Sequence, residues 1–521
     1  MRYIQGQDRD QINLFPVTID QIISADHEIR LIDVFVNRLD LESFGFYVSH
    51  EENGRPAYHP GDLLKLYIYG YLNRIRSSRM LEKECKRNVE IMWLLKMLAP
   101  DHNTISNFRR DNPKAIKKVF RETVRVANYF NLIGGTLIAG DSTKFRAQNS
   151  KKNNFNQKKT DRHLEYIENK LSEYNKMLAE NDRDQQQKKQ IEKEIEKQQD
   201  RKKRYQSIEQ QLKQNGESQV STSDPDSRQM ITRNNITEVA YNTQTTVDSK
   251  NNIPIDYKVT NTNDSKAMGN MLQRAKSILR SNSFTALYDK GYHTGSEFAI
   301  ADSLGITPLV AIPSVAAKAP NPLYNVEHFE YNKQGDFYTC PEHHKLTTTG
   351  KWHHAKTYRF KRYTTKACMT CKAKDQCSRA TYGKAIQRSE YQELIEANKE
   401  RILQNQAYYK RRQAIVEHPF GTIKRQWGFN YIMTKKTMRR ASADVGLMMI
   451  TYNLKRLISI IGISRLIAYM GAFFPYFLTL LDVIKANIMD WSNMVLLQKR
   501  INHSFKSPLN QFIFIQNLAV A

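Results

Sequence analysis

The chain has 521 residues, with 80 Lys or Arg against 53 Asp or Glu, so its formal net charge is +27. That length predicts more than one domain. So large a positive surplus favours a polyanionic partner, and a membrane surface is the less favoured anionic partner. The alternative to an anionic partner is a soluble protein whose surface carries many solvated lysines. Five cysteines in so long a chain exclude a disulfide scaffold. The sequence shows no apolar leader and no apolar segment of the ~20 residues that span a bilayer. We therefore expect a cytoplasmic protein with no membrane contact.

Residues 1–130 are predicted to be mostly helical. Apolar residues in 62–75 recur close to the helical period, and Pro60 marks the entry to this helix. Two further helices are predicted over 78–88 and 89–98. Several short helices in succession indicate a helical amino-terminal domain.

A basic segment follows these helices. Asn103 is expected to cap a helix that exposes Arg109 and Arg110. Short helices with basic ends suit DNA binding of the helix-turn-helix type, in which side chains from one helix reach into the major groove. Arg109 and Arg110 are therefore candidate DNA contacts. A plain helical bundle without that role is the alternative interpretation.

A long polar segment separates the first predicted strand from the rest of the sheet. Residues 137–148 are predicted to form a strand, whereas 161–214 contain no Gly or Pro and are dominated by Glu, Lys, Gln and Asp. Apolar residues recur in this segment at helical spacing, namely Leu164, Ile167, Leu171, Tyr174 and Leu178. We predict two long helices folded as an antiparallel hairpin. The hairpin is either a solvated spacer or a contact surface for DNA or a second subunit.

From residue 237 the pattern changes to that of a mixed sheet. Residues 239–247 are rich in β-forming residues, and 253–260 are the expected partner strand. The segments beyond alternate between helix and strand, which predicts a mixed α/β sheet: helix 266–279, strand 284–289, helix 296–304 and strand 307–312. Residues 315–385 interrupt this order, and 391–461 are predicted to be helical again.

Three acidic residues stand in contexts that suit metal-ion chemistry. Asp141 and Asp289 each end an apolar run, so both are expected where a strand reaches the open edge of the sheet. Glu417 lies on a predicted helix among basic residues, on the same face as Lys424 if the helix is continuous. Mg²⁺ prefers carboxylate oxygens, and two divalent ions ~3.5–4 Å apart can cleave a phosphodiester. On a chain this basic, the DNA backbone is the expected substrate.

Each of these acidic residues also has a plainer interpretation. An Asp after a strand often caps a helix or lies in a turn, and Glu417 can belong to a surface salt-bridge network. Pro419 removes a backbone donor and is expected to kink or restart the helix over 415–419. Asp224 and Asp226 are further candidates for the surroundings of the metal site, although the run that contains them also has the composition of a simple turn.

Taken in this order, these runs resemble the bacterial insertion-sequence DDE transposases, and among them the family called eleven-eighty-two. The resemblance covers roughly residues 10–460. Its most specific pieces are Asp289-Lys290-Gly291-Tyr292 and the run from Arg411 to Lys424. The other pieces are Tyr58-His59-Pro60 with Leu63-Leu64-Lys65, the run 100–109, Gly140-Asp141-Ser142-Thr143, Asp224-Pro225-Asp226-Ser227-Arg228 and Tyr241-Asn242-Thr243-Gln244.

The resemblance implies a fold and a division of the chain. It implies an α/β protein with a ribonuclease H-like mixed sheet as its catalytic core, formed by 131–160, 218–314 and 386–461. The expected additions are a helical amino-terminal DNA-binding domain over 1–130, the helical-hairpin insertion 161–217 and a cysteine-containing insertion over 315–385. Residues 462–521, with the apolar stretch 466–481, have no assigned role and are expected to form a packed helical tail.

The resemblance also implies roles for particular residues. Asp141, Asp289 and Glu417 would be the catalytic ligands of Mg²⁺ or Mn²⁺. Tyr409, Arg412 and Lys424 match positions that surround the Glu in related transposases and are expected to contact DNA, although Tyr409 and Arg412 stand one residue further from Glu417 than is commonest there.

The implied activity is DNA transposition. A homodimer associated with the bacterial nucleoid would bind terminal inverted repeats, hydrolyse the element's ends and join the freed 3′-hydroxyls to target DNA. No covalent protein–DNA intermediate is implied, whereas Tyr and Ser recombinases need a nucleophilic side chain. A transposase-derived DNA-binding protein without catalysis and a stand-alone nuclease of the same fold are the alternatives.

The remaining motif is a group of cysteines in the insertion. Cys340, Cys368, Cys371 and Cys377 lie within a short basic stretch of a chain that has one further cysteine. Zn²⁺ accepts four thiolates in a tetrahedral arrangement, and any one of His343, His344, His353 and His354 can replace a thiolate. Zinc binding and a set of small buried thiols are both compatible with this pattern. The surrounding Lys and Arg suit contact with a DNA backbone.

Overall fold

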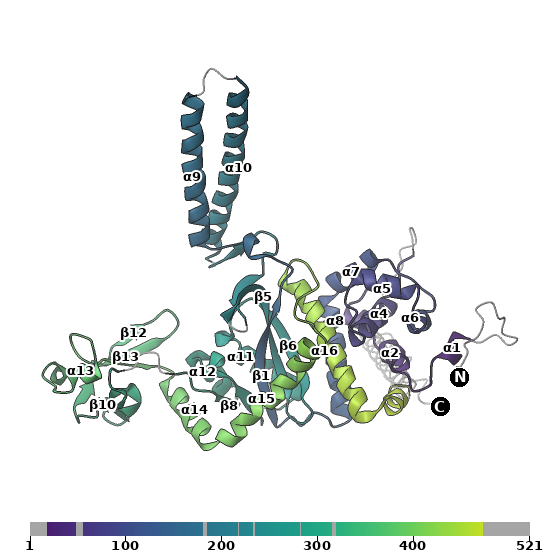
Figure 1. Cartoon of the computed structure of the whole chain (residues 1–521). Helices are drawn as coiled ribbons and strands as arrows, with labels where there is room; N and C mark the ends of the chain where they lie inside the picture. The colour runs from purple at the N-terminus through teal and green to yellow at the C-terminus, as the bar shows by residue number, and fades with distance from the viewer. Residues whose placement is uncertain are drawn as a thin grey trace, which may run out of the picture.

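The computed structural model describes residues 18–47, 56–180, 185–216, 218–232, 235–281, 283–314 and 319–471. A mixed sheet lies at the centre, with the amino-terminal helices on one side and the cysteine-containing insertion at the opposite end (Figure 1). A helical hairpin projects from the centre in a third direction. Most of the predicted tail 462–521 lies outside the described residues.

The amino-terminal region is helical, as predicted, and its helices are α1 (Ile19–Ile22), α2 (Glu28–Asn37), α3 (Leu41–Phe44), α4 (Pro60–Leu72), α5 (Ser78–Cys85), α6 (Val89–Leu94), α7 (His102–Asp111) and α8 (Pro113–Tyr129). The ring of His59 caps α4 by accepting from the Gly61 N–H, and Pro60 takes the first helical position, where no donor is needed. At α7 the predicted cap is wrong: Asp101, and not Asn103, accepts from the first-turn N–H groups. An aspartate there also offsets the positive end of the helix dipole.

The central sheet is mixed and has the strand order β4-β5-β1-β7-β8, with β6 paired to β5. Its strands are β1 (Leu137–Arg146), β4 (Arg228–Ile231), β5 (Thr237–Asp248), β6 (Ile253–Thr260), β7 (Thr285–Tyr288) and β8 (Thr307–Val310). Strands β1, β7 and β8 are parallel, while β5 runs antiparallel to β1, β4 and β6. This arrangement is a ribonuclease H-like core, so the predicted fold class and the predicted β5–β6 hairpin are confirmed.

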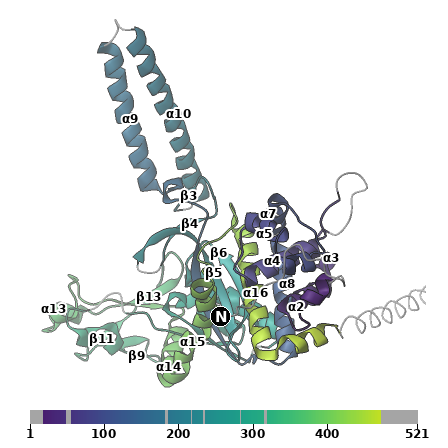
Figure 2. The ribbon, with the colours of Figure 1, turned by 45° about the vertical axis from the view of Figure 1, so that its right-hand side comes forward.

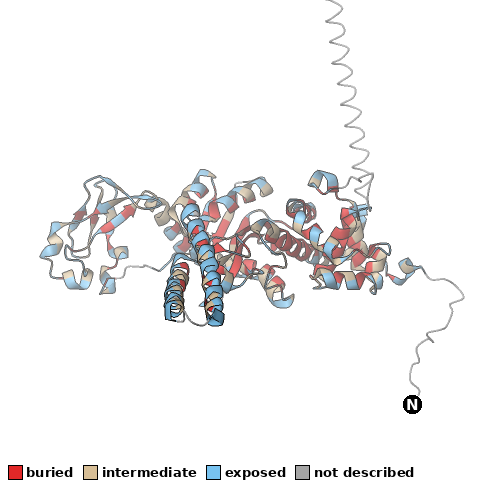
Figure 3. Cartoon of the chain, turned by 90° about the horizontal axis from the view of Figure 1, so that it is seen from above, coloured by how far each residue is buried: buried red, intermediate tan, exposed pale blue. Residues whose placement is uncertain are grey.

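Helices cover both faces of this sheet. Alternate side chains of β1 point to opposite faces, so Ile138 joins the main core, while Leu137 and Ala139 join a smaller cluster on the other face. On the first face lie α8, α11 (Met268–Leu279), α12 (Gly295–Ser303) and α16 (Met438–Ile461). On the second lie α14 (Gln392–Gln404) and α15 (Gln406–Phe420). The buried residues concentrate along this sheet and α16 (Figure 3).

The amino-terminal helices are tied to the core by a buried polar cluster. Asp444 of α16 is fully buried and accepts from Arg76 Nη2 over 2.6 Å and from the Met433 N–H over 2.7 Å. Tyr71 of α4 donates to the same carboxylate. Burial disfavours the charged carboxylate, but Arg76 and Arg109 hold the pKa of Asp444 below its ordinary value. The cluster therefore fixes α4 and α7 against α16.

The predicted helical hairpin is confirmed. Its helices are α9 (Gln157–Glu180) and α10 (Gln185–Asn215), and it starts from a short ladder of β2 (Asn154–Phe155) with β3 (Val220–Ser221). Both views show it standing clear of the sheet (Figures 1 and 2). Phe155, Ile208, Leu212 and Val220 form a small apolar cluster at its base. The hairpin is thus attached to the core through its base.

The cysteine-containing insertion is built from two small sheets. One holds β9 (Glu330–Asn332), β10 (Phe337–Thr339) and β11 (Lys345–Thr347), and the other β12 (Trp352–His354), β13 (Arg359–Tyr363) and β14 (Ile386–Ser389). A bridge between Thr347 and Thr364 links them. The sequence therefore leaves the core after β8 and returns to it at α14.

The helix restart predicted as one effect of Pro419 does not occur in α15. The helix runs through the proline to Phe420, and the irregularity follows as a π-helical stretch, η8 (Gly421–Gln426). The missing proline donor is absorbed by widening the next turn, a distortion that often lies at functional sites.

In the described part of the chain no single helix is long and apolar enough to cross a bilayer; α16 and the helix 463–471 pass that test only as a pair bent by 107°.

Candidate active site

Asp141 and Asp289 lie side by side at one end of the parallel strands. The register of β1 and β7 pairs Leu137 with Thr285 and Ala139 with Leu287. Continuing the same register by two residues brings Asp141 opposite Asp289. One detail of the prediction is wrong: Asp141 is not beyond the end of its strand, because β1 continues to Arg146 in its pairing with β5 and is bridged to Tyr431 at its last residue. It lies just past the part of β1 that pairs with β7.

Gly140 makes room for this arrangement. A side chain on Gly140 would overlap the ring of Tyr288, which is the last residue of β7. Tyr288 is fully buried and packs against Tyr292 with 4.8 Å between ring centroids. The glycine before Asp141 and the tyrosine before Asp289 therefore fit together and hold the two strands in close register.

Helix α15 places two polar side chains over the carboxylate pair. Arg412 donates from Nη1 to Asp141 Oδ2 over 3.0 Å. Tyr409 donates its hydroxyl to the Tyr288 carbonyl over 3.0 Å, directly before Asp289. The two residues are three positions apart, so they share one face of the helix. Both predicted DNA-contact positions thus lie beside the aspartates.

The electrostatics of the pair favour an added positive charge. Burial raises the pKa of Asp141, Asp289 raises it further, and Arg412 with the Ser142 N–H acts in the opposite direction. Two carboxylates at the ends of neighbouring strands are hard oxygen donors of the kind that Mg²⁺ and Mn²⁺ take. The donor set of Asp141 and Asp289 therefore fits a divalent cation.

Lys424 borders the same site from η8. Its Nζ donates to Thr143 Oγ1 over 3.1 Å and to the Lys144 carbonyl over 3.0 Å. Thr143 stands two residues after Asp141 and so faces the same side of the sheet. A lysine held here lies within the polar surroundings of Asp141.

Glu417 is not gathered with the two aspartates. It is exposed on α15, and its Oε1 accepts from Gln413 Nε2 over 2.9 Å. Among the residues that the structure describes, no three His, Cys, Asp or Glu side chains are already arranged to hold a metal ion. The structure thus brings together Asp141 and Asp289, with Tyr409, Arg412 and Lys424 around them, and leaves Glu417 at the helix surface.

Asp264 is a further acidic residue of this site that sequence reasoning missed. A side-chain carbon placed on Gly291 would lie 3.0 Å from Asp289 Oδ1 and 3.5 Å from Asp264 Oδ2, so both carboxylates flank the same turn. Asp264 accepts from Asn242 Nδ2 over 2.7 Å and from Gln244 Nε2 over 2.6 Å. The available signal was the pair of amides on the buried strand β5, which require a polar partner.

Asp224 and Asp226 have a structural role in the fold. Asp224 is buried and accepts from the Tyr241 hydroxyl over 2.7 Å and from the Thr437 N–H over 2.9 Å. Asp226 Oδ2 accepts from the Met438 N–H over 2.7 Å. Both carboxylates therefore bind free backbone donors at the start of α16, where negative charge is favourable.

The predicted exposure of Arg109 is wrong. Arg109 is only 4% exposed and donates from Nη1 to Tyr71 Oη over 2.9 Å and to the Arg76 carbonyl over 3.1 Å. It faces Asp444 across the interface between α7 and α16 because that buried carboxylate needs positive partners. Arg110 lies near the surface and pairs with Asp111 over 2.6 Å.

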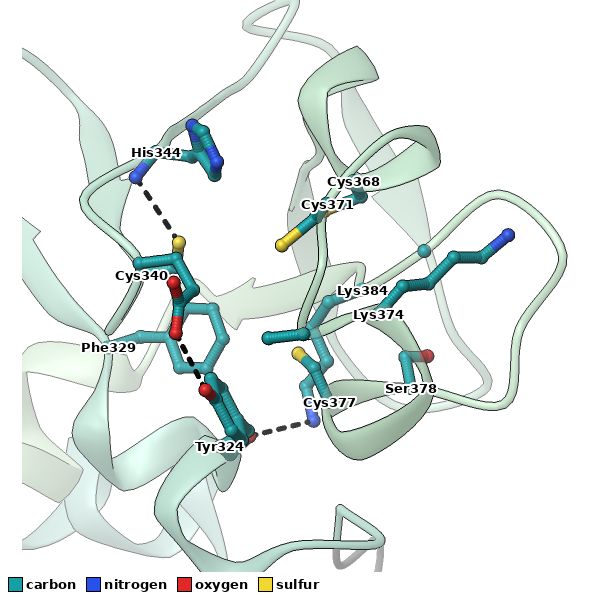
Figure 4. A pocket seen from close by; sticks show the side chains of 13 residues that line it. Tyr324, Phe329, Cys340, His344, Cys368, Cys371, Lys374, Cys377, Ser378 and Lys384 are labelled. Atoms are coloured by element: carbon teal, nitrogen blue, oxygen red, sulfur yellow. Dashed lines mark hydrogen bonds between the residues drawn. The ribbon is translucent and has the colours of Figure 1, made fainter.

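The four cysteines of the insertion line one cavity, together with His344 (Figure 4). All four are free thiols. Burial raises the pKa of the Cys377 thiol, and Lys384 acts in the opposite direction. The structure therefore brings together the whole predicted set.

Comparison with family models found two matches. A transposase domain family, DUF772, matches residues 17–111, which include α2, α4 and α7. A transposase DDE domain family matches residues 339–458, which hold Tyr409, Arg412, Glu417 and Lys424. Asp141 and Asp289 lie between the two matches. Comparison with curated proteins and with solved structures gave no match.

Proposed function

We propose that the chain, which matches two transposase family models, is an insertion-sequence DDE transposase that cuts and joins DNA at a site built on Asp141 and Asp289. The observation that carries the proposal is the register of β1 and β7, which sets these two carboxylates opposite each other. A pair of acidic residues held by a rigid sheet and covered by basic side chains suits chemistry on a phosphodiester.

Asp141 and Asp289 would hold the Mg²⁺ or Mn²⁺ that this fold family implies. When bound, such an ion activates a water and stabilises the charge that develops on the departing oxygen. The protein contributes the position of the carboxylates, which β1 and β7 fix. It also contributes a partly buried environment, which strengthens the attraction between each carboxylate and a bound cation. Asp264 would add negative charge on the other side of the Gly291 turn from Asp289.

The basic residues would bind the DNA backbone. Arg412 is the present counter-charge of Asp141, so it can turn to a phosphate oxygen once that carboxylate has another partner. Lys424 would contact the next phosphate from its place beside Thr143. Tyr409 would keep α15 seated against the end of β7 through its bond to the Tyr288 carbonyl.

Glu417 would complete the carboxylate set only after the DNA is bound. It lies on the same helix as Arg412 and shortly before the widened turns of η8. A π-helical stretch inside a helical run often lies at a functional site, and η8 directly follows the end of α15 that carries Glu417. We therefore assign Glu417 to the site as the third ligand on the strength of its place in the run from Arg411 to Lys424.

The reaction would follow the two steps of transposition. In the first, water attacks a phosphorus at the element's end, a new P–O bond forms and the 3′-oxygen leaves as a hydroxyl. In the second, this 3′-hydroxyl attacks a target phosphorus and displaces the target's own 3′-oxygen. The helical amino-terminal region would recognise terminal inverted repeats, and two copies would pair the two ends as a homodimer. The net charge of +27 supports the DNA partner.

The test is a cleavage and joining assay. Purified protein is incubated with Mg²⁺ or Mn²⁺ and labelled duplexes that carry the repeats flanking its gene, and products are separated by size. Nicking and joining that depend on the repeats, and that Asp289→Asn abolishes, support the proposal. The exposed aspartate variant Asp302→Asn is the matched control and should retain activity.

Two other results identify the alternatives. Cleavage without preference for the repeats indicates a stand-alone nuclease. Specific binding without any cleavage, under either metal, indicates a DNA-binding protein derived from a transposase.

A further inference from the structure

The four cysteines of the insertion come from separate segments that meet at one place. Cys340 follows β10, Cys368 and Cys371 belong to the turn after β13, and Cys377 ends the short helix α13 (Lys374–Cys377). They line a small cavity of about 20 Å³, the space of roughly one water molecule. The sulfurs of Cys340, Cys371 and Cys377 lie around this space (Figure 4). A monatomic ion is the ligand that fits its size.

The turn that carries Cys340 directs a backbone donor onto its sulfur. The His343 N–H donates to the Cys340 carbonyl over 2.8 Å, with His343 in the left-handed region at φ +61°. The turn directs the His344 N–H onto Cys340 Sγ over 3.3 Å. Metal ligands characteristically receive such outer hydrogen bonds.

A second turn presses directly on Cys368. Gly383 has φ +84°, and a side chain there would overlap the Cys368 Cβ. Both the conformation and the close approach require glycine. The turn that holds Gly383 thus keeps Cys368 in place at the wall of the cavity. This observation is independent of the Cys340 turn, and it indicates a built site.

The insertion has only a small apolar core. Its apolar cluster consists of Phe329, Tyr338, Leu346, Tyr363 and Ile386. Units of this size usually need disulfides or a structural metal in addition to their core. Its cysteines are free thiols, so the disulfide route is not used in this structure.

We propose that Cys340, Cys368, Cys371 and Cys377 bind one Zn²⁺ as thiolates and that this ion fastens the two small sheets of the insertion to each other. Four sulfur ligands in a closed tetrahedral site are the hallmark of structural zinc. No three of these side chains are yet arranged to hold an ion in the described residues, so the thiols must turn towards the cavity centre on binding. Lys384 beside Cys377 offsets part of the remaining negative charge.

The test is metal analysis of the full chain purified under reducing conditions without added metal. We expect one zinc per chain, and Cys371→Ser should lose it. The fifth cysteine gives the matched control, since Cys85→Ser leaves the four ligands intact and should keep one zinc. Zinc below about a tenth of an equivalent, or iron in its place, would overturn the proposal.

A second measurement separates loss of metal from failure to fold. Wild-type protein is stripped with a chelator and titrated with Co²⁺, whose absorption reports tetrahedral thiolate coordination. Saturation at one Co²⁺ per chain, reversed by Zn²⁺, supports the site. No such absorption, or mass spectrometry showing that the four cysteines pair as disulfides, would refute it. Neither readout depends on DNA cleavage, so this proposal can fail while the transposase proposal stands.

Discussion

Arg412 donates to Asp141 over 3.0 Å and joins α15 to β1 across 271 residues of sequence. The contact does two things at once. It seats the helix that carries Glu417 over the end of the parallel strands, and it supplies the positive charge that Asp141 needs in a buried position.

Removing this guanidinium should shift the pH dependence of cleavage. Burial already raises the pKa of Asp141 and Arg412 lowers it, so Arg412→Ala should raise that pKa further. Protons then compete with the metal up to a higher pH, and the acidic limb of the cleavage rate moves upwards. Rates measured against pH at fixed, subsaturating Mg²⁺ check this. Arg412→Lys should shift the limb less, Arg411→Ala should leave it in place, and an unmoved limb in Arg412→Ala would contradict the assignment.

Glu417 should be essential for cleavage and dispensable for binding. Glu417→Gln keeps the shape and removes the charge, so we expect a loss of about 10²-fold or more in cleavage with DNA affinity nearly unchanged. Gln413→Ala removes the present partner of Glu417 and should leave cleavage intact, because that bond must break when Glu417 joins the site. Near-normal cleavage by Glu417→Gln would show that the third ligand lies elsewhere.

Asp264 is predicted to act as a positioning residue for the carboxylate pair. Asp264→Asn should raise the Mg²⁺ concentration needed for half-maximal cleavage by about 10–100-fold and leave the rate at saturating Mg²⁺ close to normal, in keeping with outer partners of metal sites. The neighbouring exposed residue gives a control, Asn263→Ala, which should match wild type. A lower saturating rate with unchanged Mg²⁺ dependence would assign Asp264 a different role.

Arg109 is predicted to stabilise the fold, whereas Arg110 is predicted to contribute little to the free energy of unfolding. Arg109→Ala leaves Asp444 buried with one cationic partner fewer and should cost about 3–5 kcal/mol of unfolding free energy. Arg110→Ala should unfold at the wild-type urea concentration. Reduced DNA affinity in Arg109→Ala with unchanged urea unfolding would restore the original prediction of a DNA contact.

The same cluster makes a pH prediction. The folded-state pKa of Asp444 is held below its ordinary value of 3.8, so its contribution to stability is complete above that value and is lost as the pH falls through the lower folded-state pKa. Wild-type unfolding free energy should therefore fall at strongly acidic pH, and Asp444→Asn should flatten that part of the profile.

Much of the fold follows from local pattern. The apolar runs before Asp141 and Asp289, the β-rich pair β5 and β6, and the periodic α9 and α10 all carry their signals within a few residues. Burial depends on partners far along the chain. Arg109 resembles any basic residue at a helix end until Asp444 approaches it from 335 residues away. The local sequence pattern therefore cannot predict that Arg109 is buried against Asp444.

In the candidate active site, too, some features follow from local sequence pattern and others depend on contacts between distant segments. The glycine at 140 and the two aspartates could be predicted as an edge-of-sheet motif, because strand ends in parallel sheets meet at one edge. The continuation of β1 past Asp141 could not, since it depends on β5 pairing with residues that β7 is too short to reach. Asp264 was hidden because its role arises only where the loop after β6 folds back on Asn242 and Gln244.

The most direct test of the central claim is a double-mutant cycle on Asp141 and Asp289 in the cleavage assay. If the two carboxylates form one site, Asp141→Asn and Asp289→Asn should each lower the rate by about 10³-fold or more, and the double variant should be no slower than either. Losses that multiply in the double variant, or a near-normal rate in either single variant, would show that the register of β1 and β7 does not build the catalytic centre.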